Sequence, residues 1–286
     1  MQLDRRQVRR AFGRAAATYD QAAVLQQRMV DEIIERLQLV QLEPRTILDL
    51  GCGTGYGARA LARKYPNAHI VALDLAQAMV LHARAHNEAR GQFSWLCADA
   101  ESLPLKPASV DLILCSATLQ WCELDEVFEQ CAYVLRAEGL LTFASFGPDT
   151  LLELRESWRQ VDDQAHVHDF VDMHNVGDAL VQAGFADPVL DVEYVQLTYA
   201  DPKQALNEIR ELGSTYAATS RPRGLLGKQR YQRLLETLSA HAGSDGRIPL
   251  TFECVYGHAF ASGTMQQRIL PDGSVSIPLR PGNIKR

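Results

Sequence analysis

The glycine-rich stretch LDLGCGTGYG, residues 48–57, is the part of the chain whose residue types most clearly suit a ligand. Glycines at this spacing let the backbone approach a ligand at the start of a helix, in sites for dinucleotides, phosphates or S-adenosylmethionine. The pattern G-x-G-x-x-G fails from Gly51 because Tyr56 takes its last place, whereas G-x-G-x-x-A is met from Gly53, with Gly55 as its second glycine. The glycines alone therefore leave a nicotinamide cofactor as an alternative.

Three acidic residues end or follow successive predicted strands, namely Asp49, Asp74 and Asp99. A pyrophosphate would face Asp49 with like charge, whereas the sulfonium and ammonium groups of S-adenosylmethionine are cations that a carboxylate favours. Asp74 is placed to accept hydrogen bonds from ribose hydroxyls, a role that both cofactors share, and Asp99 suits the adenine amino group. The acids therefore favour S-adenosylmethionine, and the cofactor contacts expected beside them are Leu75, Ala100 and Ser116.

A parallel sheet is needed to bring these residues to one edge. From Thr46 to Ser145, short apolar runs alternate with helical stretches, which is typical of a doubly wound α/β sheet. Near-continuous apolar strands predict a sheet covered on both faces, and right-handed crossovers place the loops that follow the strands along one ligand-binding edge. The predicted strands are 46–50, 69–74, 93–98, 110–116 and 139–145, with helices after the glycine loop, at 76–90 and at 124–135.

The two ends of the chain differ from this core. Residues 1–40 have helical periodicity and are expected to form an N-terminal helical lid beside a cofactor-binding core at 46–146. We expect one domain over 1–260 and a weakly structured tail over 261–286, where PDG and PGN turns occur. The remaining predicted elements are helices near 148–161 and 170–183, a strand at 189–199, a helical insertion within 200–247 and a last strand at 249–260.

Composition limits the class of protein. The 286 residues are 47% hydrophobic, enough for a substantial core, and contain no run near the roughly 18 apolar residues of a membrane span. We expect a soluble, cytoplasmic protein with no membrane role and with its six cysteines reduced, since none forms a C-x-x-C pair. A formal net charge of −6 argues against nucleic-acid binding, although residues 5–14 and 221–233 each carry five basic side chains and no acid. Such runs are either solvated helix faces or docking patches for an acidic partner.

The histidines bear on what the bound cofactor reacts with. His82 and His86 have zinc-helix spacing but lack the glutamate of H-E-x-x-H, and His166, His168 and His174 form a cluster for which a metal is the less favoured interpretation. No metal is therefore expected. No histidine ends the strand predicted at 110–116, although an alcohol or carbon acceptor usually needs a base. A carboxylate acceptor explains this absence, because it is already ionised at pH 7.

The order LDLGCGTG, VALDLA, CADAESLPL and VDLILCSATLQW resembles the class I S-adenosylmethionine-dependent methyltransferases over residues 46–146. This resemblance implies a Rossmann-like fold with a seven-stranded, mostly parallel sheet in the order 3-2-1-4-5-7-6, its last strand antiparallel. S-adenosyl-L-methionine is the cofactor that it implies, as co-substrate.

The flanking segments are more specific. AFGRAAATYDQAAVLQ, FGPDTLLELRESW, HVHDFVDMHNVGDALVQAGFADP, ELGSTYAATSRPRGLLGK and IPLTFECVYGHAF resemble the malonyl-acyl-carrier-protein O-methyltransferases of biotin synthesis, from about residue 5 to 260. The resemblance implies esterification of the free carboxylate of a malonyl thioester, with malonyl-acyl-carrier protein as partner. The alternatives are methylation of a quinone precursor or free acid, and a non-methylating relative like the mitochondrial complex I assembly factor. Family members often carry asparagine where this chain has Ser116.

The residues expected to bind the methyl acceptor follow from the chemistry of a carboxylate and from the family resemblance. An arginine fork can hold one oxygen of a carboxylate while the other attacks, so Arg221 and Arg223 are candidates, with Lys228 behind them. Tyr19 matches a tyrosine that similar enzymes place over the methyl donor; packing of the first helix on the sheet is the alternative role. The residues expected to line the acceptor side are Gln120, Trp121 and Phe146.

Overall fold

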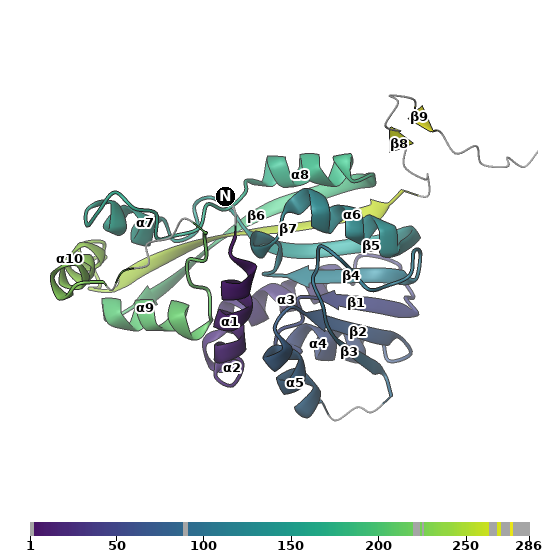
Figure 1. The fold of residues 1–286 in the computed structure, drawn as a ribbon, viewed down its shortest axis with the longest axis horizontal. Coiled ribbons are helices and arrows are strands. Elements are labelled where there is room, and N and C mark those ends of the chain that lie inside the picture. Colours follow the sequence, from purple (N-terminus) through teal and green to yellow (C-terminus); the bar gives the residue numbers. More distant parts are fainter. Residues whose placement is uncertain are drawn as a thin grey trace, which may run out of the picture.

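Seven strands form one sheet in the order β3-β2-β1-β4-β5-β7-β6 in the computed structural model (Figure 1). β7 runs antiparallel to both of its neighbours, and the other adjacent pairs are parallel. The predicted fold class and strand order are thus confirmed. The strands are β1 (Thr46–Leu50), β2 (His69–Asp74), β3 (Phe93–Cys97), β4 (Val110–Ser116), β5 (Leu135–Phe146), β6 (Phe185–Tyr199) and β7 (Ile248–Ala261). The structure describes residues 3–87, 91–219, 224, 226–262, 268–269 and 275–276.

Helices surround the sheet. Three precede the first strand, and two, α9 and α10, occupy the predicted insertion between β6 and β7. β8 (Arg268–Ile269) and β9 (Val275–Ser276) pair with each other apart from the main sheet. The helices are α1 (Arg5–Ala15), α2 (Tyr19–Ala22), α3 (Val24–Arg36), α4 (Tyr56–Lys64), α5 (Gln77–Ala85), η1 (Leu119–Trp121), α6 (Leu124–Val134), α7 (Leu152–Arg159), α8 (Met173–Gln182), α9 (Pro202–Glu211) and α10 (Lys228–Ser239). None of those described is long and apolar enough to cross a membrane.

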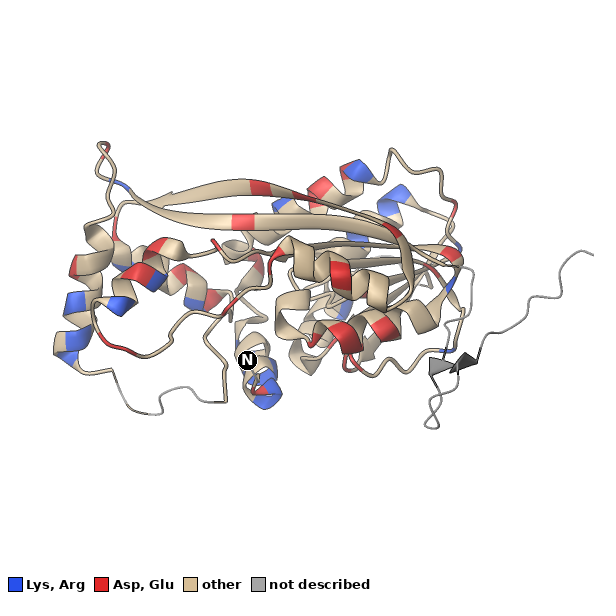
Figure 2. Ribbon diagram, turned by 90° about the horizontal axis from the view of Figure 1, so that it is seen from above, with Lys and Arg blue, Asp and Glu red and all other residues tan. Residues whose placement is uncertain are grey.

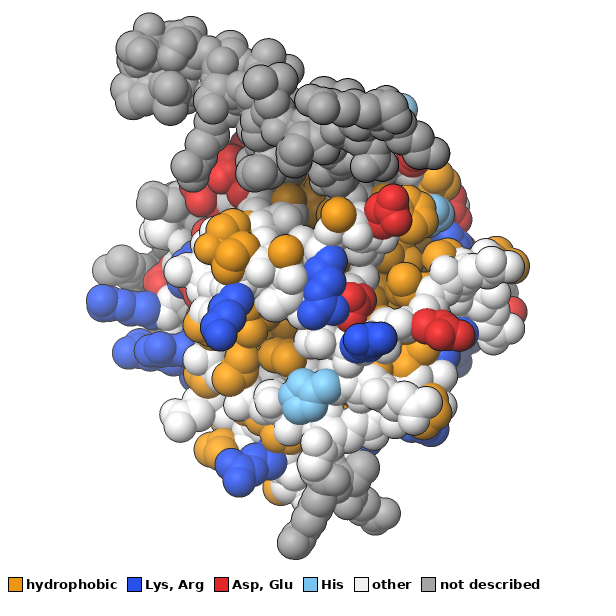
Figure 3. Space-filling model, turned by 90° about the vertical axis from the view of Figure 1, so that its right-hand side faces the viewer, with side chains coloured by type: hydrophobic (Ala, Val, Ile, Leu, Met, Phe, Trp, Pro, Cys, Tyr) orange, Lys and Arg blue, Asp and Glu red, His pale blue; other side chains and the backbone are white. Residues whose placement is uncertain are grey.

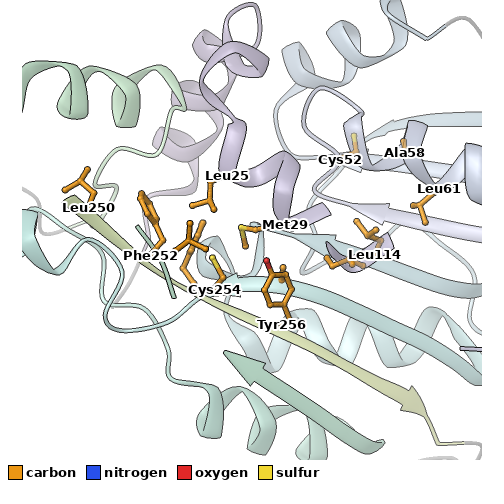
Figure 4. Packing of buried hydrophobic residues seen from close by; sticks show 14 of the residues in the cluster. Leu25, Met29, Cys52, Ala58, Leu61, Leu114, Leu250, Phe252, Cys254 and Tyr256 are labelled. Carbon is orange, nitrogen blue, oxygen red and sulfur yellow. The ribbon is translucent and has the colours of Figure 1, made fainter. Parts of the chain in front are cut away.

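Two hydrophobic clusters cover the two faces of the sheet, as the continuous apolar strands predict. One contains residues of α3 and α4, and the other contains residues of α6 and α8. Figure 4 shows Met29 of α3 beside Tyr256 and Cys254 of β7 in the first cluster. These layers fix the carboxyl ends of the parallel strands at one edge, next to α1 (Figure 1).

Two strands begin earlier than the sequence predicts. β5 follows α6 directly at Leu135, which pairs with Val110 before a shift in register. The next residues, Arg-Ala-Glu-Gly, have no apolar pattern, and Glu138 adopts a φ of +64°. β6 begins at Phe185 and contains an irregularity at Pro188, a residue that cannot donate to a ladder. Tertiary pairing therefore extends strands through segments whose local sequence favours a turn.

β6 and β7 are the longest strands, with 15 and 14 residues, and they extend beyond the parallel strands (Figure 1). Their extension carries α7, α9 and α10 at one end of the molecule, and α1 lies between these helices and the parallel strands. The α/β core and this helical extension together provide the walls of the cavities described below.

Candidate functional site

The glycine turn after β1 has a backbone that other residues would strain. Gly51, Gly53 and Gly55 have φ values of +76°, +51° and +83°. A Cβ atom on Gly51 would lie 2.0 Å from Oγ1 of Thr118, so no side chain fits there. Gly55 lies outside the cavity lining and instead lets α4 approach α5, since a Cβ atom on Gly55 would lie 3.0 Å from Cβ of Ala83.

The side chain of Asp74, at the end of β2, is hydrogen-bonded to this turn. Its carboxylate accepts hydrogen bonds from the backbone N–H of Gly53 at 2.9 Å and of Ala76 at 2.7 Å. Burial raises the pKa of Asp74 to about 6, although both N–H groups lower it. The site thus holds a carboxylate that a positively charged or hydroxyl-bearing ligand would stabilise.

Asp49 at the end of β1 is more deeply buried, at 2% exposure. Burial raises its pKa to about 7, the backbone N–H of Ala58 opposes this rise, and the charge of Asp74 adds to it. Its Oδ2 atom has no hydrogen-bond partner among the described residues. A buried carboxylate with one oxygen unpartnered favours a cationic ligand.

Asp99 lies on the same edge, where the N-terminal helix reaches it. Arg5 of α1 forms ion pairs with both Asp99 and Glu101, and the backbone N–H of Glu101 donates to Asp99 Oδ1 at 3.0 Å. The first helix is therefore attached to the loop that follows β3.

Together these elements enclose a first cavity and a lobe that continues from it. The first cavity is lined by nine of the predicted residues, and Gly51, Gly53, Ser116 and Tyr19 also line the lobe, where Asp49 lies. The structure thus brings together the strand ends that the sequence predicts. The predicted residues that line the first cavity are Tyr19, Gly51, Gly53, Asp74, Leu75, Asp99, Ala100 and Ser116, and the predicted acceptor residue Trp121 lines it as well.

A second cavity, of about 240 Å³, lies between the extension of β6 and β7 and the helices α7, α9 and α10. Its lining is largely apolar and includes Gln120, Trp121 and Phe146, the three residues predicted for the acceptor side. Lys228 is exposed at the start of α10 and does not line it. Arg221 and Arg223 lie outside the described residues.

Trp121 lies at the junction, because it lines both the first and the second cavity. Phe12 of α1 contacts its ring edge-on at 5.4 Å, and His168 does so at 4.8 Å. Gln26 of α3 lines both the second cavity and the lobe. Three elements distant in sequence thus meet where the two cavities adjoin.

His168 is a cavity residue that sequence reasoning did not assign to the acceptor side. It is 6% exposed and lines the second cavity. Its Nε2 accepts the backbone N–H of Ala217 at 3.2 Å, while the carbonyl oxygen of Thr215 is farther away, at 3.4 Å. Because Ala217 N–H is a fixed donor, the ring proton lies on Nδ1, which has no partner among the described residues. Burial lowers the pKa of His168, which favours the neutral ring, and the Thr215 carbonyl and the charge of Asp169 oppose this shift.

In the sequence, His168 was notable only as part of the histidine cluster in HVHDF, for which metal binding was the less favoured interpretation. Within the described residues, no group of three or more His, Cys, Asp or Glu side chains is arranged to hold a metal ion. His166 instead stacks on Trp158 at 3.6 Å, and its Nε2 lies 2.9 Å from Asp162. His174 is exposed beside Asp172.

Buried polar atoms without partners are concentrated around this junction. Each such atom costs about 1–3 kcal/mol unless a ligand satisfies it. In the lobe, Asp49 Oδ2 is an acceptor; beside the second cavity, Trp121 Nε1 and His168 Nδ1 are donors. Gln26 Oε1 is an acceptor that lines both spaces, and the Ser116 hydroxyl can donate or accept. Five of the eight among the described residues belong to cavity-lining side chains: Gln26 Oε1, Asp49 Oδ2, Ser116 Oγ, Trp121 Nε1 and His168 Nδ1.

Comparisons with known proteins agree with the fold. Residues 47–139 match the model of a methyltransferase domain. The YcgJ protein from Bacillus subtilis shares the fold at a TM-score of 0.58 and 16% identity, over 82% of this chain and 98% of that one. Phosphoethanolamine N-methyltransferase 2 of Haemonchus contortus, in complex with S-adenosyl-L-methionine, superposes at a TM-score of 0.53 and 19% identity, over 82% and 52% of the chains. Fold and site define a class I methyltransferase that uses S-adenosyl-L-methionine.

The sequence relatives are more specific. The malonyl-[acyl-carrier protein] O-methyltransferase of Laribacter hongkongensis is 44% identical over 97% of this chain and 96% of that protein. The chain belongs to the malonyl-[acyl-carrier protein] O-methyltransferase family. The unpartnered Oδ2 atom of Asp49 and the turn at Gly53, where an added Cβ atom would meet only the Tyr19 ring among the described residues, at 4.0 Å, fit the cationic cofactor of this class.

Proposed function

We propose that the protein esterifies the free carboxylate of malonyl-acyl-carrier protein to its methyl ester, an early step of pimeloyl and biotin synthesis. The observation that carries this proposal is the polarity of the cavity junction. An unpartnered carboxylate oxygen, Asp49 Oδ2, lies in the lobe and would face a cation there, while the unpartnered N–H groups of Trp121 and His168 line the second cavity and would face an oxygen anion. A methyl group moving from a sulfonium ion to a carboxylate needs this arrangement.

On the cofactor side, the residues of the chain would bind the methyl donor and orient it. When bound, S-adenosylmethionine supplies an electrophilic methyl group. The Asp49 carboxylate favours the positive charge of the cofactor, Asp74 accepts from its ribose hydroxyls, and Asp99 accepts from its adenine. Gly51 lets the Thr118 side chain pack against the turn, and the turn is open at Gly53, where an added Cβ atom would meet only the Tyr19 ring in the described part of the chain, at 4.0 Å. These residues contribute binding and alignment, which is the main source of rate in a displacement of this kind.

On the acceptor side, the chain supplies donors. The neutral ring of His168 carries a proton on Nδ1, and Trp121 offers Nε1–H. Tyr19 adds a phenol, because burial and the charges of Asp74 and Asp20 raise its pKa and keep it protonated. Each donor can hold an oxygen of the acyl group.

A base is not needed for this acceptor, since a carboxylate is ionised at pH 7. His168 is not free to act as one, because its Nε2 already accepts from Ala217. The apolar walls around it exclude water from the attacking oxygen.

The charged anchor of the malonyl group remains a proposal from the sequence. Arg221 and Arg223 would hold the free carboxylate as a fork, with Lys228 behind them. Leu226, which follows them closely, lines the second cavity and supports this assignment.

Mass spectrometry of malonyl-acyl-carrier protein, incubated with the enzyme and S-adenosylmethionine, tests the function. We expect one added methyl group on the malonyl species and none on acetyl-acyl-carrier protein, which lacks the free carboxylate. Methylation of both carriers, or of neither, would refute carboxyl methylation.

A further inference from the structure

A groove on the outer side of α1 concentrates positive charge. Arg6, Arg10 and Arg14 recur every fourth residue of the helix and are exposed, so they form one stripe. Arg210, exposed at the end of α9, faces the same groove. Figure 2 shows the Lys and Arg positions gathered at the N-terminal helix. The chain therefore presents a local positive surface although its net charge is −6.

These four arginines lack ion pairs with the described residues. Elsewhere in that part of the chain, Arg5, Arg28, Arg36, Arg136 and Arg230 are all paired with carboxylates. Of the two acids that line the groove, Asp4 caps α1 by accepting the backbone N–H of Gln7 at 3.1 Å, and Glu211 is exposed. The opposite end of the molecule differs, since Figure 3 shows Lys, Arg, Asp and Glu side chains interspersed there with hydrophobic ones. The groove thus carries an excess of unpaired positive charge.

The groove adjoins the second cavity, since Arg210, Thr215 and Tyr216 line both spaces. The segment that carries Thr215 and Tyr216 is hydrogen-bonded to the start of α1 through the carbonyl oxygens of Tyr216 and Ala217, so it forms the wall between the two spaces. A chain lying in the groove would reach the acceptor cavity past this segment. A thioester carried on a long arm needs such an entrance, because its carrier stays outside while the acyl group reacts inside.

We infer that this groove is the docking surface for the acyl carrier protein, and that the prosthetic arm passes from it over Arg210 into the second cavity. The inference rests on the proposed function, which supplies the partner. Carrier proteins are acidic, so the arginine stripe complements their surface and accelerates encounter. The phosphodiester of the arm is a further anion that passes the same residues.

The test compares two triple variants that change the net charge equally. In the groove variant, Arg6, Arg10 and Arg14 become Glu; in the control, the exposed residues Arg45, Arg63 and Lys106 become Glu. Each is assayed with malonyl-acyl-carrier protein and with malonyl-N-acetylcysteamine, a thioester that has neither carrier nor phosphate. We expect the groove variant to lose about tenfold or more in kcat/KM with the carrier substrate, through KM, and to stay within about twofold on the small thioester. The control should keep both rates within about threefold.

Equal loss on both substrates would overturn the inference, because it would assign the arginines to the fold or the cofactor site. Unchanged activity of the groove variant on the carrier substrate would overturn it as well. Direct binding of malonyl-acyl-carrier protein, followed by fluorescence anisotropy, separates this inference from the proposed function. If the wild-type protein binds the carrier and the groove variant does not, but the wild type methylates neither thioester, the docking inference is supported and the proposed function is refuted.

Discussion

The buried Asp49 carboxylate links the stability of the protein to its affinity for ligand. Its folded-state pKa, about 7, lies above the ordinary value of 3.8, so the folded protein binds this proton more tightly than the unfolded chain does. The resulting penalty on folding grows as the pH rises from about 4 to about 7 and is constant above. A cation in the lobe removes this penalty, which makes cofactor binding stabilising at neutral pH.

Asp49→Asn should therefore raise the melting temperature of the ligand-free protein at pH 8 by a few degrees, since about 1 kcal/mol corresponds to roughly 2–4 °C for a large domain. The gain should shrink at pH 5, where the native carboxyl is mostly protonated. S-adenosylmethionine affinity, measured by calorimetry at pH 8, should fall about tenfold or more. The exposed control Asp163→Asn should change neither quantity. A lower melting temperature at pH 8 would show that the carboxylate stabilises the empty site.

Trp121 offers a second test at the junction. Trp121→Phe keeps an aromatic ring against Phe12 and His168 but removes the unpartnered Nε1–H. Because a hydrogen bond to a charged group contributes about 1.5–3 kcal/mol, kcat/KM for the malonyl carrier should fall about tenfold or more, with little change in cofactor affinity. Trp158→Phe changes another indole of the second cavity and should cost far less. Equal losses in the two variants would point to ring packing as the role of Trp121.

At the scale of elements, the join between β5 and β7 determines where the helical extension lies. Gly257 of β7 pairs with Phe143 of β5, and a Cβ there would lie 2.2 Å from the Phe143 ring. Phe143 is fully buried and packs on Phe128 of α6 at 6.1 Å. The antiparallel strand can therefore approach this ring only through a glycine.

Gly257→Ala should lower the free energy of unfolding by about 1–3 kcal/mol in urea titrations, because the ring has no free space to enter. Gly177→Ala is the matched control, for which we expect a change of stability in the opposite direction. It lies inside α8, where a new Cβ meets Leu190 at 3.6 Å, so stability should rise by about 0.5–1 kcal/mol. Shifts of the same sign in both variants would contradict this account.

Elements also show what the sequence could and could not predict. The parallel strands and their acids were predictable, because apolar runs ending in Asp49 and Asp74 carry their own positional signal. The start of β5 was not, since Leu135 is held by pairing with Val110 and not by local propensity. His168 was ambiguous for a related reason: its neighbours Trp121 and Ala217 are about 50 residues away on each side and come together only in the folded chain.

Across the whole molecule, charge is distributed unevenly. The formal net charge is −6, yet the groove beside α1 is positive, so an acidic carrier is repelled at long range and attracted at one place. The rate of the reaction with the carrier should therefore depend on salt concentration, and the direction of this dependence should reverse if the groove loses its positive charge.

The wild type should lose kcat/KM for malonyl-acyl-carrier protein as salt rises from about 0.05 to about 0.5 M, because screening weakens the local attraction. Reversing Arg6, Arg10 and Arg14 changes the charge by two at each position, which takes the formal net charge from −6 to −12. For that variant, salt should raise the residual rate, since only repulsion is left to screen. A salt series of initial rates decides this, and parallel slopes for both proteins would contradict it.

The first helix has one further consequence. Arg5, Val8 and Phe12 on one side of it line the first cavity, while Arg6, Arg10 and Arg14 on the other side line the groove. We expect a carrier held on the outer side to hold the helix over the inner one, in which case the two substrates add in sequence, methyl donor first. S-adenosylhomocysteine then leaves last, and should inhibit competitively against S-adenosylmethionine but noncompetitively against the carrier substrate. Competitive inhibition against both would indicate random addition. With an obligatory order, the rate of turnover depends on the ratio of S-adenosylmethionine to S-adenosylhomocysteine. Flux into the pathway would then respond to this ratio in the cell.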